Sequence, residues 1–323
     1  MKPLTKQRVI AAGIMAHNEE KVIEKCIESI LAQDLGGEYE LEIEVVANAC
    51  TDRTCEIVLR KCKDVNNLRL IEVKEKGKSQ ALRVFKNWVK EWNENQRNGY
   101  KRIDKLLFID ADVRLDTKNA VYLMGKTLDN RPDLSAVLPA GVPDTTNKTS
   151  AFISHLYEAK TNLVFAVKGT AFSGQCYMIR NEVAQQIEIP DYIMVDDFYI
   201  SERLRKGYIR DYDIKYFYSV PPSVRAEINK ILRHSLGNAQ MRSFFGRGLF
   251  AQPVVEKAAP IEKSLYERRA LLKEFWKLPW DSKGLIVLFY LIGKIGDFRG
   301  KWLLKKYGPK NIKFFLEQWQ TIR

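Results

Sequence analysis

The run Leu106-Leu107-Phe108-Ile109-Asp110-Ala111-Asp112 decides how the rest of this sequence is interpreted. Its four apolar residues stand between charged ones, which is typical of a buried central strand of a parallel sheet. Ligands of open α/β sheets bind beyond the carboxyl ends of such strands. Because residues i and i+2 of an extended segment point the same way, Asp110 and Asp112 are predicted to converge on one divalent cation or polar ligand. An Asp that caps an ordinary turn gives the same pattern.

Three similar units, each with a strand, a polar loop and a helix, precede this run. The strands are predicted at 9–15, 43–47 and 68–73, and each following segment carries apolar residues at helical spacing. This alternation predicts an α/β fold with a doubly wound, mostly parallel sheet. It gathers four strand ends along one edge of the sheet, at His17, Asn48, Lys76 and Asp110. No glycine-rich dinucleotide or P-loop motif is present, which argues against those two classes of site.

Four ordered motifs resemble those of the inverting, family 2 glycosyltransferases with a GT-A fold, over roughly residues 8–245. The motifs are Ala16-His17-Asn18-Glu19-Glu20, Val45-Val46-Ala47-Asn48-Ala49-Cys50-Thr51-Asp52, Lys76-Gly77-Lys78 and Asp110-Ala111-Asp112. The resemblance implies that Asp112 and Asp110 hold a divalent metal, Mg²⁺ or Mn²⁺. It also implies a nucleotide-sugar site formed by Ala16, His17, Asn18, Glu19, Asn48, Asp52, Lys78, Asp110 and Ala111. Asn18, followed by acidic residues, equally fits the N-cap of the helix that follows.

A fifth motif lies in the second half, where Asp196 and Asp197 precede a helical pattern that reaches Leu204. It resembles the acidic pair of the same family, in which the second carboxylate is the catalytic base. Displacing a nucleoside diphosphate with inversion requires a carboxylate that accepts the proton of the acceptor hydroxyl. Asp197 is predicted to be that base, with Asp196 beside it. Two acids before a helix also fit simple capping and a favourable interaction with the helix dipole.

Small residues at 169–175 suggest a loop that leads into a strand. In the resembled family a comparable stretch lines the cleft for the sugar and the acceptor. This predicts contacts from Gly174, together with Ser173 and Gln175. Glycine in this position also fits a simple turn.

A basic stretch near residue 240 corresponds to the part of the family that faces the diphosphate. The resemblance assigns Arg233, Gln240 and Arg242 to the nucleotide sugar, since arginine suits bidentate phosphate contacts. The family's usual spacing, Gln followed after two residues by Arg-Trp, is absent here. His234 is predicted as a third metal ligand, as a late histidine is in some GT-A enzymes; a partly exposed helical histidine fits as well.

Ala47 is a departure that concerns the donor base. Family members that read uracil commonly carry Asp at this place, and its loss removes an acceptor for a base N–H. The donor nucleotide is therefore open between uridine, guanosine and other bases, with Asn48 sharing the base or ribose contact.

The length of 323 residues fits one catalytic domain and an extension. We expect a catalytic domain at 1–245, with a nucleotide-sugar half at 1–115 and an acceptor half at 116–245, and a helical, basic extension at 246–323. Five cysteines form no C-x-x-C pair and are interpreted as reduced core residues of a cytosolic protein. No charged leader followed by an apolar segment is present, so a cytoplasmic location is expected.

Positive charge is concentrated near the C-terminus. Residues 1–220 carry 33 basic and 32 acidic side chains, whereas residues 221–323 carry 20 and 8, which favours an anionic partner. The apolar run at 285–293 is shorter than the ~20 residues that span a bilayer as a helix. With its neighbouring Trp, Lys and Arg residues it predicts a peripheral segment on the anionic cytoplasmic leaflet of a membrane. A helix packed on the catalytic domain, or a dimer contact, fits the same run.

The sequence thus predicts a metal-dependent glycosyltransferase that transfers a sugar with inversion to a hydroxyl of a lipid-linked saccharide or cell-surface glycan. A non-catalytic scaffold that binds nucleotide sugars and a retaining GT-A transferase stay open. A nucleic-acid partner is not expected, because phosphate binding would not call for Asp110, Asp112, Asp196 and Asp197.

Overall fold

The computed structural model describes residues 8–95, 101–145, 149–168, 171–191, 193–204, 207–245 and 272–307, without the side chains of 239, 242–245 and 304. The strands in these ranges are β1 (Arg8–Ala16), β2 (Tyr39–Asn48), β3 (Leu68–Val73), β4 (Ile103–Asp110), β5 (Val113–Leu115), β6 (Ala136–Asp144), β7 (Cys176–Arg180) and β8 (Tyr208–Ser219). The helices are α1 (Ile23–Leu31), α2 (Thr54–Cys62), α3 (Lys78–Asn95), α4 (Ala120–Asn130), α5 (Ala151–Val167), α6 (Asn181–Gln186), α7 (Asp196–Leu204), α8 (Val224–Phe245) and α10 (Trp280–Tyr307).

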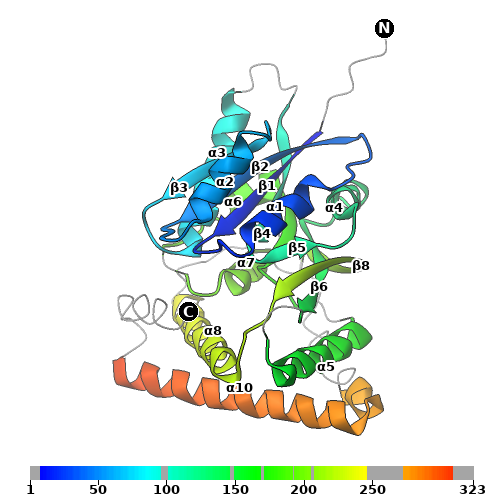
Figure 1. Cartoon of the computed structure of the whole chain (residues 1–323), viewed down its shortest axis with the longest axis vertical. Helices are drawn as coiled ribbons and strands as arrows, with labels where there is room; N and C mark the ends of the chain where they lie inside the picture. Colours follow the sequence, from blue (N-terminus) through cyan, green and yellow to red (C-terminus); the bar gives the residue numbers. More distant parts are fainter. Residues whose placement is uncertain are drawn as a thin grey trace.

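The strands form a sheet in the order β3-β2-β1-β4-β7-β6-β8-β5. β1 to β4 pair in parallel, as the sequence predicts, and their carboxyl ends meet at one edge. The second half is mixed, since β7 runs antiparallel to β4 and β6, and β5 runs antiparallel to β8. The predicted α/β class with a mostly parallel sheet is confirmed, and Figure 1 shows the helices around the sheet.

Burial on both faces explains the continuous apolar character of β1. Its residues alternate between two cores: Ile10, Ala12 and Ile14 pack in one with α1, while Val9, Ala11 and Met15 pack in the other with α3. Helices therefore cover both faces of the sheet, which leaves the strand ends as the place for a ligand.

The C-terminal helix α10 lies across α5 and α8, at the bottom of Figure 1. Its inner stripe packs Leu285, Phe289 and Ile292 against residues of α5 and α8. Cβ atoms added at Gly296 and Gly300 would lie 2.6 Å from Ile231 and 2.8 Å from Ser235, so these glycines permit close approach to α8. Residues 246–271 and 308–323 of the expected extension lie outside the described residues. Among those described, the helices all fall short of the length and apolar character needed to cross a membrane.

Candidate active site

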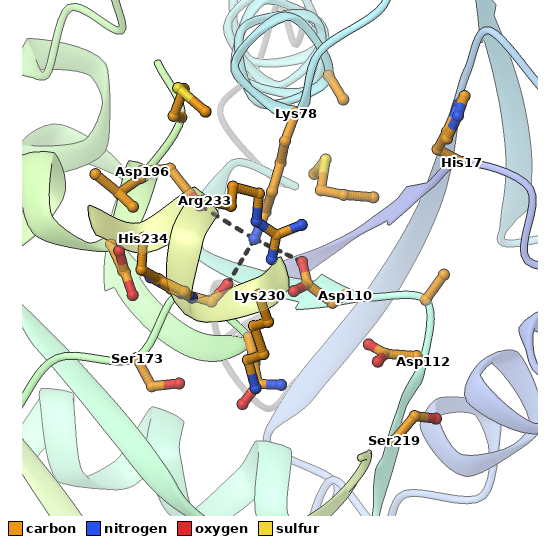
Figure 2. Close-up of a pocket in the computed structure, with 18 of the residues that line it drawn as sticks. His17, Lys78, Asp110, Asp112, Ser173, Asp196, Ser219, Lys230, Arg233 and His234 are labelled. Carbon is orange, nitrogen blue, oxygen red and sulfur yellow. Dashed lines mark hydrogen bonds and ion pairs between the residues drawn. The ribbon is translucent and has the colours of Figure 1, made fainter. Parts of the chain in front are cut away.

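A cavity of about 570 Å³ lies at the carboxyl ends of β1, β2 and β4, with the start of α7 and one face of α8 as its opposite walls (Figure 2). It contains both predicted acidic pairs. The predicted site residues that line it are Ala16, His17, Glu19, Asn48, Lys78, Asp110, Ala111, Asp112, Gly174, Asp196, Asp197, Arg233 and His234. Segments that are far apart in the sequence thus contribute carboxylates to one space.

Lys78, at the start of α3, joins the two acidic pairs. Its Nζ lies 2.7 Å from Asp110 Oδ1 and 3.1 Å from Asp196 Oδ2, and it donates to the carbonyl of Gly174 at 3.0 Å. Figure 2 shows these three contacts as dashed lines. A side chain that the sequence assigns to the nucleotide-sugar site therefore links β4 with α7 in this structure.

The charges of this cluster support one another. Burial lowers the pKa of Lys78, but the carboxylates of Asp110 and Asp196 outweigh burial and raise it above its ordinary value. Burial raises the pKa of Asp110, and the lysine opposes that change. Lys78 is consequently protonated, whereas burial outweighs the lysine at Asp110 and raises the pKa of that carboxyl to about 7.

Asp197 lies at the first turn of α7, where its Oδ1 accepts the N–H of Phe198 at 2.8 Å. Burial, followed by the nearby Asp196, raises its pKa to about 6, against the opposing effects of Lys78 and Arg233. A carboxylate with a pKa just below neutrality is ionised at pH 7 and still basic enough to accept a proton.

Gly174 lets the acidic pair approach the loop before β7. A Cβ at this position would lie 3.1 Å from both Asp196 Oδ2 and Asp197 Cβ. The next residue, Gln175, accepts a hydrogen bond from the Tyr216 hydroxyl at 3.3 Å, and its carbonyl accepts the N–H of Asp110 at 2.8 Å. The small-residue loop therefore holds α7 and the end of β4 in one arrangement.

Asn48 fixes the loops on the other side of the cavity. Its side-chain amide donates to Glu75 O at 2.5 Å and accepts the N–H of Gly77 at 2.7 Å, and its carbonyl accepts from His17 Nδ1 at 2.5 Å. Asn48 thereby positions the loop that carries Lys78.

Three of the residues assigned to the nucleotide sugar do not line the cavity: Asn18, Asp52 and Gln240. Asn18 accepts the N–H of Thr51 at 2.7 Å, and it does not cap α1, which begins at Ile23. Asp52 accepts from Glu20 N at 3.1 Å and from Thr54 N at 3.0 Å. Gln240 is buried and accepts the N–H of Met194 at 3.1 Å. These contacts tie loops together, which motif matching does not distinguish from ligand contacts.

Arg242 lies in α8, but its side chain is outside the described part of the chain. Arg233 and His234, more than two helical turns earlier in the same helix, face the cavity. Burial, with Arg233 and Lys230, lowers the pKa of His234 to about 4, so its imidazole is neutral at pH 7.

The carboxylates of Asp110 and Asp112 fit a divalent cation that takes most of its ligands from a substrate. Across the described residues, His, Cys, Asp and Glu side chains form no group of three that would hold a metal, so His234 is not assembled with Asp110 and Asp112. The two carboxylates still supply hard oxygen ligands at the end of β4. Mg²⁺ commonly binds one or two carboxylates together with substrate phosphates, and this arrangement meets that requirement.

Sequence reasoning did not find Lys160 of α5 and Lys230 of α8, which also line the cavity. Lys230 had a detectable signal, because it precedes Arg233 and His234 by three and four residues and so shares their helical face. Lys160 had none, since only the packing of α5 against α8 brings it to the cavity.

The chain resembles known proteins both in sequence and in structure. Residues 12–188 match the family model described as glycosyl transferase family 2. No curated protein sequence matches the chain. A mannosyltransferase from Pyrobaculum calidifontis, PcManGT, solved in complex with GDP-Man and Mn²⁺, has a TM-score of 0.57 at 19% identity, over 98% of this chain and 86% of that one. TarS 1–349 of S. aureus, solved with UDP-GlcNAc, has a TM-score of 0.47 at 15% identity, over 90% of this chain and 88% of that one.

The family match covers more than half of the sequence, and it includes β2 to β4, the second half of β1 and the strand ends that form one wall of the cavity. The structural likeness to PcManGT extends over nearly the whole chain and confirms the expected GT-A fold. The chain belongs to glycosyl transferase family 2 and is a glycosyltransferase.

Proposed function

We propose that this glycosyltransferase moves a sugar from a nucleoside-diphosphate sugar to an acceptor hydroxyl, with inversion and with the help of a divalent cation. The observation that carries the proposal is the shared cavity, in which Asp110 and Asp112 face Asp196 and Asp197 across Lys78. Two acidic pairs with the Lys78 ammonium group between them suit two separate tasks, the binding of a diphosphate and the activation of a nucleophile.

Asp197 is the base in this proposal. It lines the cavity from the α7 side, opposite the strand ends that would hold the diphosphate. Its neighbour Asp196 forms an ion pair with Lys78 at 3.1 Å, and Asp197 takes no part in that ion pair. The acceptor hydroxyl gives its proton to Asp197 as its oxygen forms the new bond to the anomeric carbon and the bond to the diphosphate breaks.

Asp112 and Asp110 would hold Mg²⁺ or Mn²⁺. Bound there, the cation would supply neutralisation of the charge on the departing diphosphate. Lys78 and Arg233 line the same cavity and add positive charge toward phosphate oxygens. The Mn²⁺ and GDP-Man of PcManGT support this choice of ligands.

A panel of GDP and UDP sugars, with Mn²⁺, with Mg²⁺ and with EDTA, tests the proposal by release of nucleoside diphosphate. EDTA and Asp112→Asn are each expected to lower turnover at least 100-fold, because the diphosphate loses its counter-charge. Asp116→Asn, an exposed acid four residues along, is the matched control.

Turnover that survives both EDTA and Asp112→Asn would contradict metal dependence. Product analysis by NMR separates the alternatives, since a product with the donor's anomeric configuration indicates a retaining transferase. Tight donor binding without any turnover would instead favour a non-catalytic scaffold.

We further propose that the acceptor is a lipid-linked saccharide or cell-surface glycan and that the enzyme works on an anionic, cytoplasmic membrane surface. Support comes from the outer stripe of α10, which we define as Trp280, Val287, Leu291, Ile295, Phe298 and Trp302. These residues recur at helical spacing on the side away from α8. Trp280 is 82% exposed, Phe298 is 72% exposed and Trp302 is 54% exposed. Isolated exposed apolar residues are ordinary, but a continuous stripe marks an interaction surface.

Lysines flank the outer stripe. Lys283, Lys294, Lys301 and Lys305 recur at intervals of whole helical turns along one edge. Lys283 Nζ lies 4.8 Å from the Trp280 ring centroid, and Lys306 Nζ lies 5.1 Å from that of Trp302. Aromatic rings with ammonium groups beside them are typical of helices that lie in the plane of an anionic membrane surface.

A further inference from the structure

Lys160 and Lys230 form a cationic pair that the proposed chemistry does not use. They come from α5 and α8 and line the cavity. Both ammonium groups lie over the ring of Tyr157, at 5.4 and 5.5 Å from its centroid. In Figure 2 Lys230 lies below Asp110, whereas Lys78 enters from the opposite side.

Carboxylates lie in the neighbourhood of the pair without forming an ion pair with it in the described part of the chain. In the described part of the chain, no carboxylate lies within 4.0 Å of either ammonium group. The nearby Glu227 accepts a hydrogen bond at Oε2 from the Tyr157 hydroxyl, at 2.6 Å. Lys230 donates to that same hydroxyl oxygen at 3.2 Å. Burial, followed by the adjacent Lys230, lowers the pKa of Lys160 to about 8 against the opposing effect of Glu227.

A buried charge is costly unless a partner compensates it. Two lysines that share one tyrosine and face an open cavity therefore favour an anion in that cavity. Ammonium groups bind phosphate well as point charges.

The location of the pair indicates the acceptor side. The nucleotide-sugar motifs end at β1 to β4, whereas α5 and α8 belong to the half of the chain assigned to the acceptor. Burial lowers the pKa of Lys230, and Glu227 opposes this most, followed by Asp112 and Asp197, so this lysine lies within electrostatic range of both acidic pairs. Lys160 Nζ lies 4.7 Å from the Phe289 ring centroid and thus reaches toward α10.

We propose that Lys160 and Lys230 form a subsite for a phosphate group carried by the acceptor, so that the acceptor is a phosphate ester whose hydroxyl reaches Asp197. The inference rests on the proposed glycosyl transfer and specifies its acceptor. The phosphate can belong to a lipid-linked molecule or to a water-soluble ester, and the chemistry at the two lysines is the same.

Calorimetric titration tests the subsite in protein that is saturated with Mg²⁺ and a nucleotide. The nucleotide is GDP or UDP, chosen as the one that stabilises the protein more against heat. The probes are octyl phosphate and glycerol 1-phosphate, with octanol and glycerol as uncharged counterparts. Lys160→Met and Lys230→Met keep the aliphatic stems and are each expected to weaken binding of a phosphate ester at least tenfold. Lys90→Met, an exposed lysine on α3, is the matched control.

The loss of affinity for the ester should exceed any loss of affinity for the nucleotide at least fivefold. Binding of either ester in this pattern supports the subsite, and the preferred ester identifies its source. Wild-type protein that binds neither ester overturns the inference, as does an equal loss for nucleotide and ester, which would assign the lysines to the donor. Turnover of the nucleotide sugar is measured separately. Ester binding without turnover contradicts the proposed glycosyl transfer but not the proposed phosphate subsite. Lys160→Arg retains the charge and checks that loss of binding is not a loss of folding.

Discussion

Glu44 on β2 is buried without compensation. Its side chain is 0% exposed, and within the described residues neither carboxylate oxygen has a hydrogen-bond partner. Burial raises its pKa from 4.5 to about 7, although Arg69 opposes the change. The folded protein therefore holds a proton that the unfolded chain releases between these two pH values. Stability must fall as the pH rises through this window, because the folded state then binds more protons than the unfolded state.

Glu44→Gln removes this proton and with it the pH dependence. The variant's free energy of unfolding, relative to wild type, should increase by up to about 3 kcal/mol between pH 4.5 and pH 8. Urea unfolding at both pH values measures the difference. Glu91→Gln, an exposed acid on α3, should show no such trend, and a flat difference for Glu44→Gln would mean that water reaches the carboxylate.

The proposed base gives a second pH effect. Asp197 accepts a proton only when ionised, and its pKa is about 6, so kcat should rise with pH up to about 7 and then level off. Asp197→Asn should lower kcat at least 100-fold and remove this rise, while nucleotide binding stays within a few-fold of wild type. Glu202→Gln, on the same helix and exposed, is the control. Steady-state kinetics from pH 5 to 8 provide the measurement, and an Asn variant with wild-type turnover would exclude Asp197 as the base.

The residues of the cavity differ in how far the sequence predicts them. Asp110 and Asp112 were predictable because a strand end has a fixed place in a parallel sheet. The contact of Lys78 with Asp196 was not, because it joins segments more than 100 residues apart through a tertiary contact. Asn48 lies in a stretch that resembles a family motif, and Gln240 lies in one that lacks the family's usual spacing. Both side chains accept backbone N–H groups, and sequence alone does not show the partner of an amide.

For the strands, local periodicity was sufficient to predict the element wherever polar residues bound the apolar run at both ends. β3 spans Leu68–Val73 as predicted, and the strands at 9–15 and 43–47 are each extended by a few residues. The antiparallel direction of β7 was not predicted, since it depends on pairing with β4 and β6. The run at 285–293 was interpreted as one apolar segment, whereas the helix divides it between an inner stripe on α5 and α8 and an outer stripe.

The outer stripe of α10 is testable by vesicle flotation. Wild-type protein should float with vesicles that contain anionic phosphatidylglycerol and not with neutral phosphatidylcholine vesicles. Replacing Trp280, Phe298 and Trp302 together by Ser should weaken association at least tenfold, because the buried aromatic area is lost. Leu59→Ser, at a 50% exposed position on α2, is the control.

Two results would contradict membrane docking by this stripe. One is no association of wild-type protein with either kind of vesicle. The other is light scattering that shows a dimer which the triple variant abolishes, since the stripe would then be covered by a second copy of the chain.

A hydrophobic cluster connects α10 to the residues that line the cavity. The Tyr157 ring, over which both cavity lysines lie, packs edge-on against Phe289 of α10 at a centroid distance of 6.0 Å. Ile153, Leu156 and Val220 complete this cluster with Ile292. The proposed catalytic domain at 1–245 and the extension therefore share a hydrophobic core, and we expect them to depend on each other for stability.

Truncation after residue 245 tests this dependence. The fragment 1–245 loses the cover of Ile153, Leu156 and Tyr157, and each large side chain returned to water costs about 1.5–3 kcal/mol. Its free energy of unfolding should drop by roughly 5 kcal/mol or more, measured by urea unfolding beside the full chain. Nucleotide binding at low temperature should persist, because its loops follow β1 to β4, while phosphate-ester binding should weaken as Tyr157 loses the support of Phe289. A fragment as stable as the full chain would instead make the extension a separate unit that only rests on α5 and α8.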